Sequence, residues 1–228
     1  MKQIIYPATA LLLIFLATGC KKKQGDNVNL DPGKQEWYDF MSSKTGSYWR
    51  YAAPDGTFWT RHAREKDTMM LNKKYRYYER RDDGSSGYDP EYFGKNNSFY
   101  LTLIDLDGSR SNYIDYIYYK DSAVVTNAFT NTGEVNSPIG KVNITIESHV
   151  AEDNLTLNYG SNIFTNVIHV HSNVFGSATL VPRTKVGELD IWFKKGIGII
   201  RENADINILS GAYKKKYMDS LIDYHIAP

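Results

Sequence analysis

The sequence predicts a mainly β protein: an antiparallel curved sheet, shaped as a half-barrel or barrel, with a short N-terminal helix. The chain of 228 residues contains 18 Tyr, 9 Phe and 4 Trp, and aromatic residues favour half-buried, pleated strands. Apolar and polar residues alternate with the period of a strand along much of the chain. Tight-turn signals separate these runs, and the spacing typical of parallel strand–helix–strand units is missing.

The beginning of the chain has the form of an export signal. Lys2 precedes the apolar run Ile4–Leu16, and the small residues Ala17–Gly19 follow it. The run is short for a membrane span, which needs about 20 apolar residues. Because a charge, an apolar run and small residues in this order are typical of a cleavable secretory signal, we expect residues 1–19 to be removed as a signal peptide.

Cys20, the single cysteine of the chain, directly follows this signal. The segment Leu16-Ala17-Thr18-Gly19-Cys20 resembles the bacterial lipobox, although Ala17 stands where that motif usually has Leu. The resemblance implies cleavage before Cys20 and attachment of acyl chains, palmitate among them, to this residue. Since each buried methylene contributes about 0.8 kcal/mol, several acyl chains anchor a protein stably to a membrane.

The segment after the cysteine is polar and is predicted to be a tether. Residues 20–33 contain Lys21–Lys23 and end at Pro32-Gly33, with no apolar periodicity, as in a flexible linker. Lysines rather than acidic residues after the cysteine favour an outer-membrane lipoprotein that faces the periplasm, while display on the cell surface stays open. Residues 34–228 are predicted to form a single β-rich domain.

The elements of this domain follow from periodicity. Trp37, Phe40 and Met41 make one apolar stripe at helical spacing, which predicts a short helix over 34–43 that docks on the sheet. Asp55-Gly56 is a hairpin signal between the first two strands. About ten strands are expected. The eleven candidate runs are 47–51, 57–65, 74–81, 99–106, 113–119, 122–126, 141–149, 162–172, 189–194, 197–201 and 220–226.

The charge of the chain excludes one class of partner. Loss of residues 1–19 removes Lys2 from the 27 basic residues and none of the 26 acidic ones, so the mature chain has 26 of each. A neutral domain lacks the basic surface that nucleic acid requires. The partners expected are therefore a membrane, through the lipid on Cys20, and an apolar or glycan ligand or another envelope protein.

His169 and His171 are the strongest candidates for metal ligands. Residues i and i+2 of a strand point to the same side, and His149 or a carboxylate such as Glu147 could supply a third ligand from another strand. The competing interpretation is two histidines on the solvent face of a strand. Because two ligands without a defined third are a weak signal, we predict no metal and no cofactor.

Catalytic motifs are missing from the sequence. It has no Gly-x-Ser-x-Gly elbow, and its only cysteine is assigned to lipid. We therefore predict a protein that is not an enzyme, with ligand-binding residues unassigned. The tyrosines of segments 74–81 and 113–119 could form a stacking platform for sugars or apolar ligands, but cross-strand aromatic packing is the preferred interpretation.

Three segments resemble small Bacteroidota-type envelope lipoproteins of unknown function. Gly46-Ser47-Tyr48-Trp49-Arg50-Tyr51 is similar to their first strand, Gly-x-x-Trp-x-Tyr. Segment 191–200, where Trp192-Phe193 precedes a Gly-x-Gly turn, is similar to their hairpin near the C-terminus, and Leu221-Ile222-Asp223-Tyr224 to their closing strand. The resemblance implies an antiparallel curved sheet and a role in the cell envelope, and it supplies no catalytic residues.

Three functions stay open at this point. The first is a non-enzymatic, membrane-anchored ligand-binding domain, which a lined pocket in a curved sheet would support. The second is an accessory subunit of an envelope complex, which an exposed apolar patch without a cavity would support. The third is a metal-dependent hydrolase, which would need His149, His169 and His171 to converge.

Overall fold

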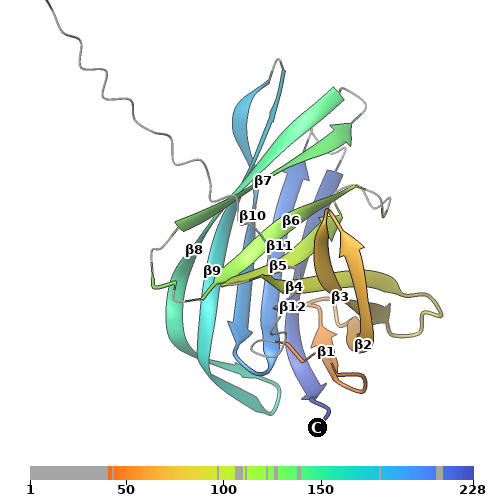
Figure 1. The fold of residues 1–228 in the computed structure, drawn as a ribbon. Helices are drawn as coiled ribbons and strands as arrows, with labels where there is room; N and C mark the ends of the chain where they lie inside the picture. The colour runs from red at the N-terminus through yellow and green to blue at the C-terminus, as the bar shows by residue number, and fades with distance from the viewer. Residues whose placement is uncertain are drawn as a thin grey trace, which may run out of the picture.

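The computed structural model describes residues 41–228 apart from 43, 97, 106–109, 111, 122, 126–127, 138–139, 180 and 209–212. The expected signal peptide, Cys20, the tether and nearly all of the expected helix lie outside the described residues. Within them the chain forms twelve strands (Figure 1). These are β1 (Tyr48–Ala52), β2 (Phe58–Met70), β3 (Lys73–Asp82), β4 (Asp89–Asn96), β5 (Phe99–Asp105), β6 (Tyr113–Lys120), β7 (Ala128–Ser137), β8 (Gly140–Tyr159), β9 (Asn162–Ala178), β10 (Val181–Lys194), β11 (Gly198–Ile208) and β12 (Tyr213–His225).

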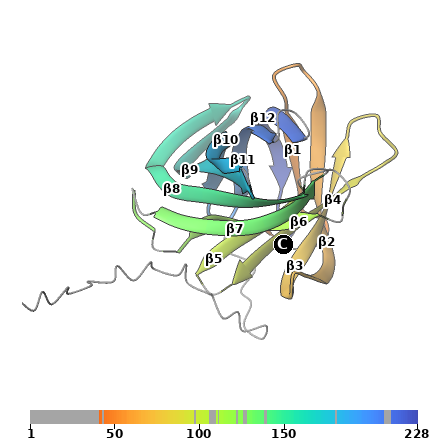
Figure 2. The same cartoon turned by 90° about the horizontal axis from the view of Figure 1, so that it is seen from above.

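The strands form one sheet in the order β6-β5-β4-β3-β2-β1-β12-β11-β10-β9-β8-β7. Every neighbour in this order is also a neighbour in sequence, except β1, which pairs with β12. All ladders between the strands are antiparallel. Seen from above, the sheet curls until its two edge strands, β6 and β7, face one another (Figure 2). The expected antiparallel, barrel-like sheet is thus confirmed.

The two edge strands meet at a seam that side chains hold together. The described parts of β6 and β7 are not neighbours in a hydrogen-bonded ladder. Instead, the backbone N–H of Ile117 donates to Asn131 Oδ1 over 3.0 Å. Gly133 of β7 lies against Ile114 of β6, where an added Cβ would come within 2.5 Å of Ile114 Cγ2. A glycine is therefore required for the strands to approach this closely.

The core lies inside the barrel, as the alternating burial of the strands requires. On β1, Trp49 and Tyr51 are fully buried while their neighbours face outward. Two buried serines also lie in the interior. Tyr116 Oη is 2.8 Å from Ser172 Oγ, which is itself 2.8 Å from Ser148 Oγ. This chain of hydroxyl groups joins β6 to β9 and β8 across the interior.

Two strands were not predicted, and one predicted strand is wrong. β4 contains Pro90 and Gly94, and β7 points Asn131 and Gly133 at β6, so neither shows a clear apolar alternation. Conversely, the apolar run expected as a strand at 122–126 forms only an isolated bridge, from Val125 to Val150, within its described part. The hairpin predicted at Asp55-Gly56 is present, with Gly56 at φ 84°.

Candidate functional site

A charged group lies in the middle of the barrel. The alternation of β2 points Trp59, Arg61 and Ala63 inward, and the side chain of Arg61 is only 1% exposed. A buried guanidinium must be paired and hydrogen-bonded, because leaving it unpaired costs several kcal/mol. Its partners therefore define the polar part of the interior.

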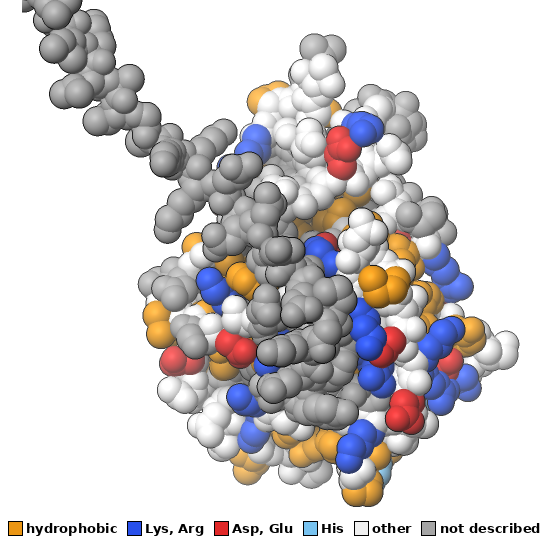
Figure 3. All heavy atoms as spheres, in the orientation of Figure 1, with side chains coloured by type: hydrophobic (Ala, Val, Ile, Leu, Met, Phe, Trp, Pro, Cys, Tyr) orange, Lys and Arg blue, Asp and Glu red, His pale blue; other side chains and the backbone are white. Residues whose placement is uncertain are grey.

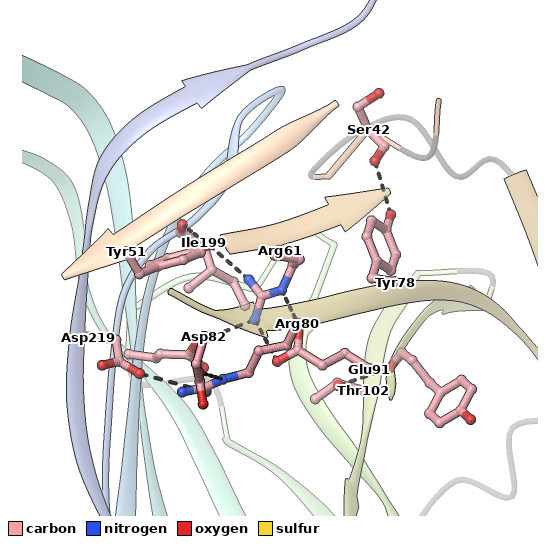
Figure 4. Close-up of polar contacts among 12 residues, drawn as sticks. Ser42, Tyr51, Arg61, Tyr78, Arg80, Asp82, Glu91, Thr102, Ile199 and Asp219 are labelled. Carbon is pink, nitrogen blue, oxygen red and sulfur yellow. Dashed lines mark hydrogen bonds and ion pairs between the residues drawn. The ribbon is translucent and has the colours of Figure 1, made fainter. Parts of the chain in front are cut away.

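Arg61 bonds with groups from three other strands (Figure 4). Its Nε donates to Glu91 Oε2 over 2.5 Å, and its Nη2 donates to Glu202 Oε1 over 3.3 Å. Its Nη1 donates to the hydroxyl of Tyr51 over 2.8 Å. This hydroxyl donates in turn to the carbonyl oxygen of Ile199 over 2.9 Å. The donors of this guanidinium are thus engaged within the protein.

Aromatic rings enclose the charged groups. Tyr51 and Trp59 are stacked, with ring centroids 4.2 Å apart. The guanidinium of Arg61 lies 4.9 Å from the ring centroid of Phe93, and that of Arg80 lies 4.0 Å from the ring of Trp59. Such cation–π contacts fix the planes of both guanidinium groups.

Two carboxyl groups near Arg61 titrate in opposite directions. Burial alone would raise the pKa of Glu91, but the charge and hydrogen bonds of Arg61 hold it below its ordinary value. For Asp219 burial prevails: together with the charge of Glu202 it raises the pKa to about 6, although Arg80 opposes the rise. The reason is geometric, because the nearest cationic atom, Arg80 Nη1, is 3.9 Å from Asp219 Oδ2.

A partly enclosed cavity of about 130 Å³ adjoins this network. The charged residues of its lining are Arg61, Arg80, Glu91, Asp105, Glu202 and Lys215. The lining also contains apolar residues, among them Phe93, Ile104, Leu189, Ile191, Ile199 and Ile206. The cavity can therefore hold a small molecule that has one charged or polar end and one apolar end.

The three candidate histidines lie on another part of the barrel. His169 Nε2 and His171 Nδ1 are 2.8 and 2.9 Å from the same oxygen, Asp190 Oδ1. The ring centroid of His149 is 5.5 Å from that of His171, and His169 stacks on Trp192 at 4.2 Å. Burial and the charges of the other two histidines lower the pKa of His149.

This histidine cluster is not arranged as a metal site. In the part of the chain that the structure describes, no group of three or more His, Cys, Asp or Glu side chains could hold a metal ion. The cluster also lies on the face of the sheet opposite to the cavity, since the buried residues Val170 and Ser172 alternate with His169 and His171. It therefore adds nothing to the interior site.

The tyrosines considered as a platform are divided among several places. Tyr78, Tyr116 and Tyr118 are part of the main core. Tyr75 belongs to a separate small cluster with Leu101 and Leu103. Only Tyr116 of this set lines the cavity, so a continuous tyrosine surface is not formed there.

The polar residues of the interior were missed by the sequence analysis. Arg61 stands between Trp59 and Ala63 in the inward phase of β2, and Glu202 stands in the same way between Ile200 and Ala204 of β11. A charged residue at an inward position is the signal that could have found them. The sequence alone did not reveal this signal, because which face of each strand points into the barrel depends on how the strands are ordered in the sheet.

Figure 3 shows Lys, Arg, Asp and Glu side chains interspersed with hydrophobic ones on one face, which thus carries no large area of a single charge. Among the described residues, we find no helix with the length and apolar character needed to cross a bilayer.

The barrel with a charged cavity was compared with known proteins. No family model matches the sequence, and no curated protein matches it. A solved structure of a candidate lipoprotein from Parabacteroides distasonis is similar, with a TM-score of 0.50 and 11% identity over 84% of this chain and 100% of the other. A candidate exported protein with a YmcC-like fold from Bacteroides fragilis has a TM-score of 0.49 and 10% identity over 82% and 99%. At these identities the first likeness shows a shared fold.

Proposed function

We propose that this protein is an envelope lipoprotein, anchored through Cys20, whose barrel binds a small ligand in its interior cavity without acting as an enzyme. Its place would be the outer membrane, facing the periplasm. The lipobox-like sequence at Cys20 supports this address, and so does the description of the Parabacteroides distasonis neighbour as a candidate lipoprotein.

The observation that carries the binding proposal is the charged cavity. Buried ion pairs are weak contributors to stability, and apolar side chains of the same volume often replace them without loss. The interior nevertheless holds Arg61, Glu91 and Glu202 beside a space that the core leaves unfilled. Convergent polar groups at the edge of an apolar space are typical of a ligand site.

The size of the cavity limits the ligand. Its 130 Å³ is below the roughly 300–1,000 Å³ of pockets for drug-sized molecules. It is close to the engineered cavity of about 150 Å³ that takes up benzene. A metabolite of this size, or one end of a larger molecule, fits the space.

Native mass spectrometry of the full-length lipoprotein, released from detergent, tests this function. Wild type is expected to retain a small noncovalent adduct. Ile104→Phe, which fills the cavity, should lose it. Ile163→Phe is the matched control, because Ile163 is 71% exposed. The proposal would be overturned if the adduct survived Ile104→Phe. It would also be overturned if the wild type carried no adduct and bound no small acid, amide or amine.

A further inference from the structure

We propose that the ligand of this cavity is a small organic monocarboxylate, an inference that rests on the proposed function. Its carboxylate would be bound by Arg80 and Lys215. Its apolar body would lie against Leu189, Ile191 and Ile206, which line the same cavity, and Ile206 is the cross-strand neighbour of Lys215.

Arg80 and Lys215 carry donors that the protein does not use. The closest carboxylate oxygens to Arg80 are Asp82 Oδ1, 3.6 Å from Nε, and Asp219 Oδ2, 3.9 Å from Nη1. Both distances exceed a hydrogen bond. Among the described residues, the ammonium of Lys215 makes no hydrogen bond or ion pair, and it lies 5.0 Å from the ring centroid of Tyr217. Two cations with free N–H groups therefore face one cavity.

The other charged groups that the structure describes around the cavity do not accept hydrogen bonds from Arg80 or Lys215. Arg61 directs its donors to Glu91, Glu202 and Tyr51. Glu91 in turn accepts from Arg61 with both oxygens. Arg80 and Lys215 are thus without a hydrogen-bonded acceptor in the described lining of the cavity, and a carboxylate supplies about four acceptor positions in a small volume.

The apolar part of the cavity lining determines what the rest of the ligand must be. Leu189, Ile191 and Ile206 are each at most 5% exposed, so an ion alone would leave dry apolar surface unfilled. By comparison with the cavity that takes up benzene, the space suits a body of roughly six to ten non-hydrogen atoms. An aromatic or branched aliphatic acid meets both requirements.

Binding of an anion would couple to protonation of Asp219. The charged groups that face Asp219 are Arg61 on β2, Arg80 on β3 and Glu202 on β11. Glu91 and Asp105 also line the cavity, and Glu91 is held by Arg61. A carboxylate bound to Arg80 adds a negative charge at the guanidinium that faces Asp219, so it favours the protonated form of Asp219. Affinity is therefore expected to rise as pH falls from about 7.5 to about 5.5.

Isothermal titration of the full-length lipoprotein in detergent tests the inference with three probes of one shape: benzoate, benzamide and benzylamine. Benzoate is expected to bind at least about tenfold more tightly than the amide and the amine. Lys215→Met should weaken benzoate about tenfold or more. Lys214→Met, at the exposed neighbouring position on the other face of β12, should leave it unchanged. Asp219→Asn should bind benzoate without the dependence on pH.

The outcomes separate this inference from the proposed function. Equal binding of benzamide or benzylamine, or full benzoate affinity in Lys215→Met, would overturn the carboxylate class. The binding function would still stand if Ile104→Phe abolished whatever binding is seen. A wild type that binds none of the probes but keeps an adduct that Ile104→Phe removes would also reject the carboxylate. Melting temperatures of all variants identify any that fail to fold.

Discussion

Asp219 Oδ2 lies 3.9 Å from Arg80 Nη1, too far for a hydrogen bond, although Asp219 is buried and Arg80 lines the interior cavity. Asp219 is 3% exposed on its side chain and has no hydrogen bond to its Oδ2 among the described residues. Burial removes water from this carboxylate, and its interactions with the protein do not fully compensate for that loss. This explains why the pKa of Asp219 rises to about 6 from 3.8.

Stability should therefore fall with rising pH because of Asp219. Its native pKa of about 6 exceeds the unfolded value near 3.8, so the native state binds this proton more tightly. The contribution is complete below the unfolded pKa and is lost as pH rises through 6, with a size of about 3 kcal/mol. Asp219→Asn should gain free energy of unfolding relative to wild type between about pH 4 and about pH 7, measured by urea denaturation. The exposed Asp205→Asn serves as control, and parallel pH curves for wild type and Asp219→Asn would contradict the prediction.

Replacement of Arg61 should be severely destabilising. Arg61→Met leaves Glu91 and Glu202 without their common partner, and breaking a buried pair costs about 3–5 kcal/mol. Adding Glu202→Gln to Arg61→Met should recover part of the loss. The matched change Arg201→Met removes a guanidinium that is only partly buried, so it should cost about 1 kcal/mol or less. If Arg61→Met unfolds at the same urea concentration as Arg201→Met, the network does not hold the barrel together.

The seam between β6 and β7 should be sensitive to a single methyl group. Gly133→Ala would place Cβ 2.5 Å from Ile114 Cγ2, and overpacking of this kind costs about 1–3 kcal/mol. Gly87→Ala is the control, since the nearest atom there is 3.6 Å away. In a double-mutant cycle, Ile114→Ala should make Gly133→Ala less costly. Purely additive effects would show that the contact is not the cause.

The proposed lipid anchor can be tested through Cys20, the only cysteine of the sequence. Cys20→Ser should abolish labelling by radioactive palmitate and move the protein from the membrane fraction to the soluble fraction, because several acyl chains are lost together. Lys21→Ser, the neighbouring change, should leave both unaffected. Continued palmitate labelling of Cys20→Ser would refute the lipoprotein assignment.

The class of fold could be predicted because it depends on local signals. The Asp55-Gly56 pair indicates one turn, and the alternation of residues 141–149 indicates one strand. The length of β8 could not be predicted in the same way, since it continues to Tyr159. Beyond Val150 the strand is interrupted by register shifts and exposes Glu152–Asn154, so apolar alternation ends although pairing with β9 continues.

The interior site could not be predicted, for a different physical reason. Arg61, Glu91 and Glu202 belong to β2, β4 and β11, and each is an ordinary charged residue in its own segment. Only the closure of the sheet brings the three together around a shared volume. The histidines had the opposite property: His169 and His171 are conspicuous in the sequence, but they face away from that volume.

On the proposed route of export from the N-terminus, the pairing of β1 with β12 imposes an order of events on folding. Tyr48 bonds with Asp223, which is 175 residues later in the sequence. On that route, the middle of the sheet cannot be completed until the last strand has crossed the inner membrane. Until then β1 keeps one edge unpaired beside a hairpin, and such edges invite pairing with other chains. Periplasmic chaperones that hold emerging chains apart are consequently expected to determine how much of this protein reaches its native state.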